Sequence, residues 1–302
     1  MPVIVQAGTF NPASLVVPDL YVNVQQPAAA GGNVVSTDRI GLVGTAPWGP
    51  VDTPVVIGSY ADYAAAFGAA TALATDLGTA VRFSALVGAN DFRCVRVTDG
   101  TDTAATATIG TATPITLTSR YTGSGGALTK YALVQNATNP NMWTLQITKP
   151  GMTSEAYTVI WGGATADASY ATFWNTMVGY INNGGGNYAA SKILVASSGN
   201  PGAPAAIALT SLTGGSDGGV PATAKYVGSD TNPRTGMYAL RTTGCALGVV
   251  LDNTDTDFWS EAVAFGLSEG VYMMLSGLSG AGYAATATVL QTQGIHPYEA
   301  TA

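Results

Sequence analysis

The stretch RIGLVGTAPWGPVDTPVVIGSYADYAAAFG, residues 39–68, decides how the rest of the sequence is interpreted. It begins with IGLVG, a short apolar run of the kind that forms a buried strand. A turn rich in glycine and proline follows directly, where a nucleotide-binding fold would place its phosphate loop. Prolines 47, 50 and 54 lack backbone donors, and residues 40–68 contain no Lys or Arg. The turn is therefore predicted to be rigid and structural, with Trp48 offering apolar surface to the core or to another molecule.

The residues after the turn predict a parallel crossover unit. Ser59 is a good N-cap, and Gly68 ends the short helix YADYAAAF. A second helix is predicted over about residues 73–87, where apolar side chains recur at helical spacing. The segment FRCVRV, residues 92–97, then predicts another strand. Strand, helix and strand at this spacing are typical of an α/β domain.

Changes in composition along the chain predict its domain organisation. Residues 1–36 carry four prolines and one alternating segment, and are predicted to form an extended N-terminal arm. Residues 98–219 are rich in Thr, Ala, Gly and Asn, with short alternating strands, and are predicted to form an inserted β-rich domain. The α/β pattern occupies residues 37–97 and 220–302, which are predicted to build one discontinuous core from both ends of the chain.

The arm contains a candidate for an intersubunit contact. Its strand LYVNV precedes a flexible run at residues 28–32. A lone strand cannot stabilise itself, so it must pair with a sheet edge in its own chain or in another. The residues predicted to pair are Leu20, Tyr21, Val22, Asn23 and Val24.

Composition narrows the class of protein. Charged residues make up 10% of the 302 residues, and hydrophobic residues make up 47%. Such low charge favours a protein that works inside an assembly, although a neutral surface of Ala and Thr would also explain it. The net charge of −7 and the scattered Lys and Arg argue against direct nucleic-acid binding. Cys94 and Cys245 are predicted to be buried free thiols.

The segment 271–290 is the one stretch that is long enough and apolar enough to be considered as a membrane span. Serines, threonines and glycines interrupt it. We therefore expect a strand, a loop and a helix there, and no stable membrane insertion.

Three short motifs partly match sites of chemistry. GLSGA places Ser279 after a strand, with Asp252 and His296 as nominal partners, but Ala281 replaces the glycine that a nucleophile elbow needs. DNTDTD, residues 252–257, spaces its side chains like a calcium loop but lacks the glycine turn and the glutamate. TGSGGAL, residues 122–128, lacks the third glycine of a dinucleotide loop. No catalytic residue, cofactor-binding residue or metal ligand is therefore predicted, and the protein is not expected to be an enzyme.

Several segments, taken in order, resemble contractile phage tail sheath proteins. The stretch from VGTAPWGP to AAAFG resembles the family's strand end, Gly-Pro turn and short helix, and VPDLYVNV lies where the family has its arm, although Asp19 and Leu20 depart from it. A helix and strand of the family's core resemble AVRFSALVGANDFRCVRV. The inserted domain of the family begins with a segment similar to TSRYTGSGGALTKYALV and ends with one similar to LTGGSDG. The return to the core resembles RTGMYALRTTGCALGVVLDN. The matching positions in the turn and helix are Gly44, Thr45, Ala46, Gly49, Pro50, Ser59, Phe67 and Gly68.

The resemblance implies a structural subunit of a contractile tail sheath, which polymerises around the tail tube and contracts to drive it through the host envelope. It implies no cofactor. Implied partners are further copies in stacked hexameric rings, the inner tail tube protein, and baseplate and tail terminator proteins. The implied location is the phage tail in the virion, assembled in the host cytoplasm.

Three alternatives stay open from the sequence. The family's C-terminal domain and arm are not found before Ala302, so the chain is either a short relative or a truncated one. The sheath could instead belong to a phage-tail-like bacteriocin, an extracellular injection system or a type VI secretion system. A serine hydrolase using Ser279 is the alternative from another class.

Overall fold

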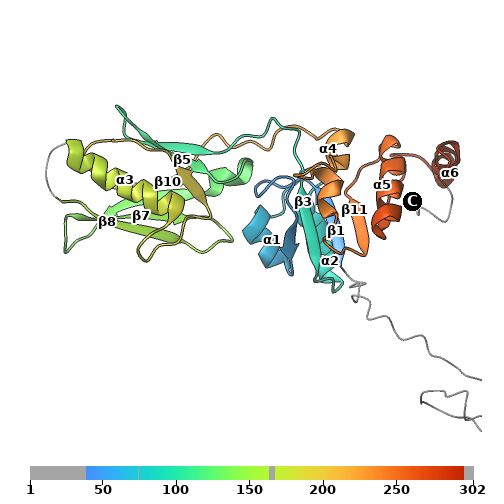
Figure 1. Ribbon diagram of the computed structural model, residues 1–302, viewed down its shortest axis with the longest axis horizontal. Coiled ribbons are helices and arrows are strands. Elements are labelled where there is room, and N and C mark those ends of the chain that lie inside the picture. Colours follow the sequence, from blue (N-terminus) through green and yellow to red (C-terminus); the bar gives the residue numbers. More distant parts are fainter. Residues whose placement is uncertain (1–38, 74, 163–166, 296–302) are drawn as a thin grey trace, which may run out of the picture. The chain divides into compact units, whose positions relative to one another are not determined.

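The computed structural model describes residues 39–73, 75–162 and 167–295 (Figure 1). The strand predicted at residues 20–24 and His296 lie outside these described residues. The described chain has a mixed α/β fold with three sheets, so the predicted mixed α/β class is confirmed.

The elements follow one another in a mixed order. The strands are β1 (Ile40–Gly44), β2 (Val55–Ile57), β3 (Phe92–Arg96), β4 (Thr106–Ile109), β5 (Ile115–Ser119), β6 (Lys130–Gln135), β7 (Met142–Thr148), β8 (Glu155–Ile160), β9 (Leu194–Ala196), β10 (Ile207–Ser211), β11 (Leu247–Val250) and β12 (Tyr272–Met274). The helices are α1 (Tyr60–Phe67), α2 (Leu77–Leu86), α3 (Asp167–Asn183), α4 (Thr223–Val227), α5 (Asp257–Glu269) and α6 (Tyr283–Thr292), with the 3₁₀ helices η2 (Ser124–Leu128) and η3 (Gly236–Leu240).

A five-stranded sheet, which we call the mixed sheet, joins strands that are distant in the sequence. Its order is β12-β11-β1-β3-β2. The first four strands are parallel, and β2 runs antiparallel to β3. In the middle of the sheet, Ile40 stands opposite both Phe92 and Leu247. Parallel neighbours need crossover connections, and the helices between these strands provide them.

Both faces of the mixed sheet are covered. In β1, Leu42 packs into a cluster with side chains of α1 and α2, while the next residue, Val43, packs into a second cluster with side chains of η3, α4 and α5. This alternation follows from the two-residue period of a strand. Burial on both faces explains why the sequence of β1 is apolar throughout.

The first two helices show how local signals set helix ends. Around α1 the prediction is confirmed: Ser59 Oγ accepts a hydrogen bond from the Asp62 backbone at 3.2 Å, and Gly68 ends the helix at φ +87°. The predicted start of the second helix at residue 73 is wrong, because α2 begins at Leu77. Asp76 caps it, accepting from the backbone N–H of Thr79 at 2.9 Å, and Thr75 has a φ of +58° that no helix residue adopts.

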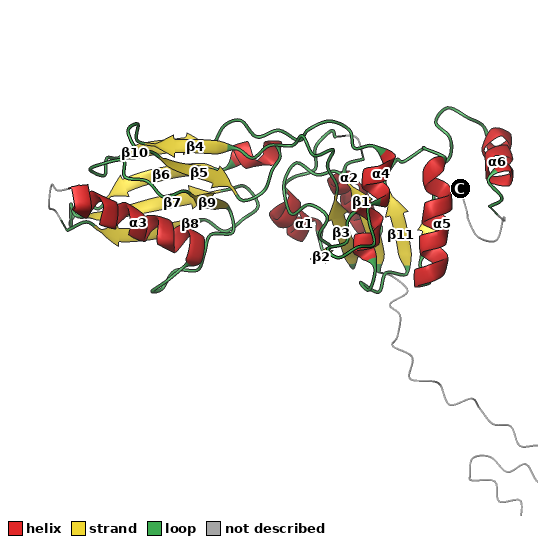
Figure 2. Ribbon diagram, turned by 45° about the horizontal axis from the view of Figure 1, so that its top comes forward, coloured by secondary structure: helices red, strands yellow, loops and turns green. Residues whose placement is uncertain are grey.

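The β-rich segment, residues 98–219, forms the other two sheets. One has the order β10-β6-β7-β8 and the other β4-β5-β9. Helix α3 packs against both, contacting β8 and β9 (Figure 2). Their apolar side chains form a cluster separate from the two that cover the mixed sheet. The exact domain boundaries at residues 98 and 219 stay a prediction.

Two smaller expectations can be compared with the fold. Cys94 and Cys245 are free and buried, as predicted. Segment 271–290 forms β12, a loop and most of α6, as predicted, and no helix among the described residues is long and apolar enough to cross a membrane.

Candidate functional site

The last residue of β1 and the turn that follows it, residues 44–50, contain most of the predicted site residues that match the family's turn and helix, and we call this segment the signature turn. Thr45 donates a backbone hydrogen bond to Thr75 at 2.9 Å and accepts one from Leu77 at 2.9 Å. These bonds bring the end of β1 against the start of α2. A Cβ atom on Gly44 would lie 2.5 Å from the Thr75 carbonyl oxygen, so only glycine fits here.

The signature turn also contacts the end of α1. Gly49 has a φ of +101°, and a Cβ atom there would lie 2.5 Å from the ring of Phe67. Gly68 approaches the Pro47 ring, at 3.3 Å from an added Cβ atom. The structure therefore brings Gly49, Phe67 and Gly68 together, three positions that the family resemblance selected one by one. Within the turn Ala46 is buried and Pro50 is half-buried, whereas Ser59 lies at the far end of α1, where it serves as the cap.

Trp48 connects the signature turn to the β-rich segment. Its side chain is only 1% exposed. The indole Nε1 donates a hydrogen bond to Ser119 Oγ at 2.9 Å, and the ring meets Tyr121 edge-on with centroids 4.9 Å apart. The sequence left open whether Trp48 packs inside the chain or against another molecule. The structure shows that it packs inside, against β5 and the residues that follow it.

Arg96 fixes the same turn from the mixed sheet. Its side chain is fully buried at the end of β3. The guanidinium donates to the carbonyl oxygens of Ala46 at 2.9 Å and Gly49 at 2.8 Å, and it pairs with Asp102 at 3.5 Å. A buried cation with these partners is satisfied, and removing it would leave buried acceptors and a carboxylate unpaired. Arg96 therefore joins the turn to the start of the β-rich segment.

The glycines of TGSGGAL have a structural role at this contact. The backbone N–H of Gly125 donates to the Pro47 carbonyl oxygen at 2.8 Å. Gly123 has a φ of +115°, and a Cβ atom on it would overlap the same carbonyl. Glycine is needed because two backbones approach closely, and a ligand-binding loop is rich in glycine for the same reason.

Lys149, the residue directly after β7, also takes part in this contact. It is 3% exposed, and its Nζ lies 4.3 Å from the centroid of the Trp48 ring. Desolvation lowers the pKa of Lys149 to about 8. The aromatic face stabilises the charged form in part, since a cation is attracted to the π electrons. Nothing in the sequence pointed to this pair, because the two residues are far apart in the chain.

Neither GLSGA nor DNTDTD forms a site of chemistry within the described part of the chain. Ser279 lies exposed in the turn before α6, and its nominal partner His296 is outside the described residues. In the DNTDTD segment, Asn253 Oδ1 accepts from the Asp255 backbone and Asp255 Oδ1 accepts from the Asp257 backbone, both at 3.1 Å. Asp255 thus satisfies the backbone N–H of the first residue of α5, and Asn253 holds the loop before it. Among the described residues no group of three or more His, Cys, Asp or Glu side chains could hold a metal ion.

Several apolar side chains are exposed on the two edge strands of the mixed sheet and at the end of α2, and sequence reasoning missed them. The edge strands β2 and β12 expose Val56 and Tyr272, at 65% and 55%. The last turn of α2 and the residue after it expose Leu86 and Val87, at 75% and 87%. A helical pattern in the sequence predicts which face of a helix is buried, but it does not show which of the other apolar residues are exposed to solvent.

Comparison with known proteins bears on the fold. No family model and no curated protein matches the sequence. The solved structures that are similar include two sheath tail proteins. One is Lin1278 from Listeria innocua, with 15% identity and a TM-score of 0.55, and the match covers 80% of this chain and 48% of that one. The other is DSY3957 from Desulfitobacterium hafniense, with 16% identity and a TM-score of 0.52, and the match covers 85% of this chain and 52% of that one. The chain thus spans about half the length of these proteins. Its fold is of the sheath tail protein type.

Proposed function

We propose that this chain is a structural subunit of a contractile tail sheath and not an enzyme. The observation that carries the proposal is the likeness to two sheath tail proteins, which extends over 80% and 85% of this chain. The sequence adds support, because the segments that resemble the family occur in the family's order. In such a sheath, subunits polymerise around an inner tube and repack into a shorter form, driving the tube through the host envelope. The energy comes from the difference between two packings of the same subunits, so no nucleotide is required.

The proposed domain arrangement is a core built from residues 37–97 and 220–302, with residues 98–219 inserted. It is supported by the mixed sheet, in which β1 and β3 pair alongside β11 and β12. It is also supported by the separate apolar cluster of the β-rich segment. The signature turn then acts as the joint between core and insertion, through Trp48 and Arg96.

The proposed connection between subunits is the arm, residues 1–36. Its strand at residues 20–24 would add to a sheet edge of a neighbouring subunit. In the described chain the mixed sheet ends at β2 and β12, and a sheet edge is where a further strand can add. About four or five backbone hydrogen bonds at roughly 0.5–1.5 kcal/mol each make one link modest, but a polymer repeats the link at every subunit.

The proposed partners follow from the same function. They are further copies of the chain in stacked hexameric rings, the inner tail tube protein, and the baseplate and tail terminator proteins. The proposed location is the tail of a phage particle, assembled in the host cytoplasm. The exposed apolar residues of α2 and of the sheet edges provide surface for the contacts between copies.

Negative-stain electron microscopy of the purified protein tests the proposal. We expect rings or tubes from the chain of residues 1–302 and only monomers from residues 37–302, with the same cooperative thermal unfolding in both. Tubes from the truncated chain would show that the arm is not the connector. Absence of any ordered assembly from residues 1–302, at concentrations up to the solubility limit, would contradict the sheath function itself.

A further inference from the structure

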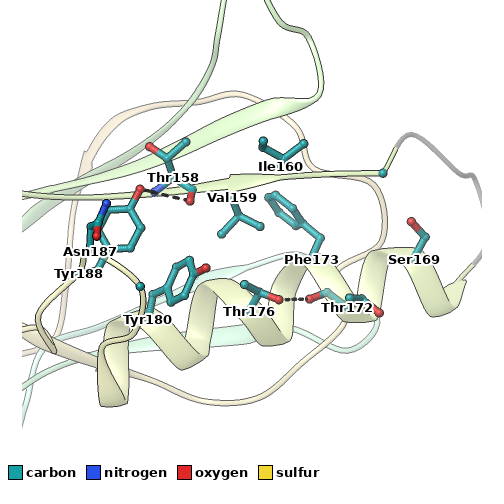
Figure 3. A pocket seen from close by; sticks show the side chains of 12 residues that line it. Thr158, Val159, Ile160, Ser169, Thr172, Phe173, Thr176, Tyr180, Asn187 and Tyr188 are labelled. Atoms are coloured by element: carbon teal, nitrogen blue, oxygen red, sulfur yellow. Dashed lines mark hydrogen bonds between the residues drawn. The ribbon is translucent and has the colours of Figure 1, made fainter.

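A groove lies between the edge strand β8 and helix α3 of the β-rich segment (Figure 3). Its cavity volume is about 630 Å³, which is within the usual range for sites that bind small ligands. Phe173 and Tyr180 of α3 lie across the groove from Val159 of β8. None of its lining residues belongs to the signature turn, so the groove is separate from the joint described above.

The lining of the groove is neutral and rich in hydroxyl groups. Ser169, Thr172, Thr176 and Tyr180 contribute hydroxyl groups, of which that of Thr176 donates to the Thr172 carbonyl oxygen. Asn187 contributes an amide, and Tyr180 and Tyr188 contribute aromatic rings. Thr158 contributes its backbone, because its hydroxyl bonds that of Thr144 in the neighbouring strand β7. Among the side chains that the structure describes, no Asp, Glu, Lys, Arg or His lines it. A charged ligand would therefore lose hydration without gaining an ionic partner. A neutral ligand that carries many hydroxyl groups on a carbon ring matches both the aromatic and the polar parts of this surface.

The two tyrosines of the groove differ in their hydrogen bonds: the hydroxyl of Tyr188 is bonded within the described chain, and that of Tyr180 is not bonded there. The hydroxyl of Tyr188 lies between the backbone N–H and carbonyl of Thr158, at 3.3 and 3.4 Å, which holds its ring in place. Tyr180 lies beside it, with ring centroids 5.0 Å apart. Within the described ranges of the chain, the Tyr180 hydroxyl and the Asn187 side chain have no hydrogen-bond partner. Both are therefore free to bond a ligand in the groove.

A second hollow continues the groove along β8. It has a volume of about 500 Å³ and shares Asn187 and Tyr188 with the first. Its other lining residues include Tyr157, the neighbour of Thr158 in the strand, and two charged residues, Glu155 and Lys192. The Glu155 carboxylate is occupied, because it accepts hydrogen bonds from the Ser191 hydroxyl and the Lys192 backbone. Two hollows that share a wall suit an extended ligand of several linked units better than a single small molecule.

We propose that the groove between β8 and α3 binds a neutral oligosaccharide. The rings of Tyr180 and Tyr188 pack against the apolar faces of the sugar rings, and the Tyr180 hydroxyl and the Asn187 amide exchange hydrogen bonds with sugar hydroxyls. This site goes beyond the sheath function, because polymerisation and contraction do not require it. The β-rich segment would then have a ligand-binding role besides its place in the sheath subunit.

Isothermal titration calorimetry of the full chain tests the site, with maltohexaose, cellohexaose and hexa-N-acetylchitohexaose as probes and a hyaluronan hexasaccharide as an acidic comparison. We expect at least one neutral probe to bind with a dissociation constant in the millimolar range or tighter, and the acidic one to bind more weakly. Tyr180→Ala should weaken binding at least ten-fold. Tyr180→Phe should have a smaller effect, since it removes only the hydroxyl.

The matched control is Tyr283→Ala, because Tyr283 is 89% exposed and lies outside the groove. It should leave binding unchanged. Asn187→Ala provides a second test at an exposed residue, where loss of folding is not expected, and should weaken binding several-fold. Failure of all three neutral probes to bind would overturn the proposal. Equal affinity of the wild type and folded Tyr180→Ala and Asn187→Ala variants, or tighter binding of the acidic probe, would overturn it as well.

Discussion

The buried Lys149 should make the stability of this protein rise with pH in the alkaline range. The residue is 3% exposed, and its ammonium group has the face of the Trp48 ring at 4.3 Å in place of a carboxylate. Burial disfavours the charged form, and it lowers the pKa to about 8 from the usual value of about 10.4. The charged Lys149 therefore destabilises the folded state at neutral pH, and the neutral form relieves this.

The sign and the size of the effect follow from proton linkage. Between pH 8 and about 10.4 the unfolded chain binds this proton and the folded chain does not, so the free energy of unfolding rises with pH. Each pH unit in that window adds about 1.4 kcal/mol. From pH 7 to about pH 10, Lys149 should thus contribute about 2 kcal/mol of added stability.

The assay is urea unfolding followed by tryptophan fluorescence, with the wild type and Lys149→Met compared at both pH values. The pKa of Tyr157, which burial raises to about 12, and that of Cys94, which burial also raises, make stability fall at alkaline pH. Both proteins share those groups, so the difference between wild type and variant isolates Lys149. We expect this difference to shift in favour of the wild type by about 2 kcal/mol on going from neutral to alkaline pH. A difference that stays constant within about 0.5 kcal/mol would refute the reasoning.

Three further predictions concern other residues. Arg96→Ala should lower the free energy of unfolding by about 3–5 kcal/mol in urea titrations, since it leaves a buried carboxylate without its cation and two carbonyls without a donor. The control Arg234→Ala breaks a surface pair and should cost less than about 1 kcal/mol. Similar losses in both variants would contradict the role given to Arg96. Gly123→Ala should lower the thermal midpoint much more than Gly88→Ala, because both have positive φ but only Gly123 meets a backbone carbonyl, and equal shifts would show that the close approach does not matter. Generic ester substrates should be hydrolysed no faster with the wild type than with Ser279→Ala, and activity that the substitution abolishes would restore the hydrolase hypothesis.

The sequence by itself determined the features that depend on nearby residues. The mixed α/β class, the ends of α1 and the breakup of segment 271–290 into strand, loop and helix were all predicted correctly. Each depends on signals within a few residues, such as the cap at Ser59 and the positive φ at Gly68. The start of α2 was predicted wrongly because apolar spacing alone was used, and the cap at Asp76 was overlooked. The arm and the domain boundaries stay predictions.

Only the tertiary structure decided the contacts between distant parts of the chain. The prolines of the turn are visible in the sequence, but nothing near Trp48 in the sequence indicates that its side chain contacts Ser119 and Lys149. The same holds for the groove, whose two walls come from β8 and α3 and whose ring of neutral side chains is spread over about 30 residues. The physical reason is that hydrophobic periodicity in the sequence shows only which face of a helix or strand is buried. The hydrophobic effect is roughly proportional to the apolar area that is buried and is not directional, so it does not specify which element covers that face. The partner on the other side depends on how whole elements pack, and that information is not local.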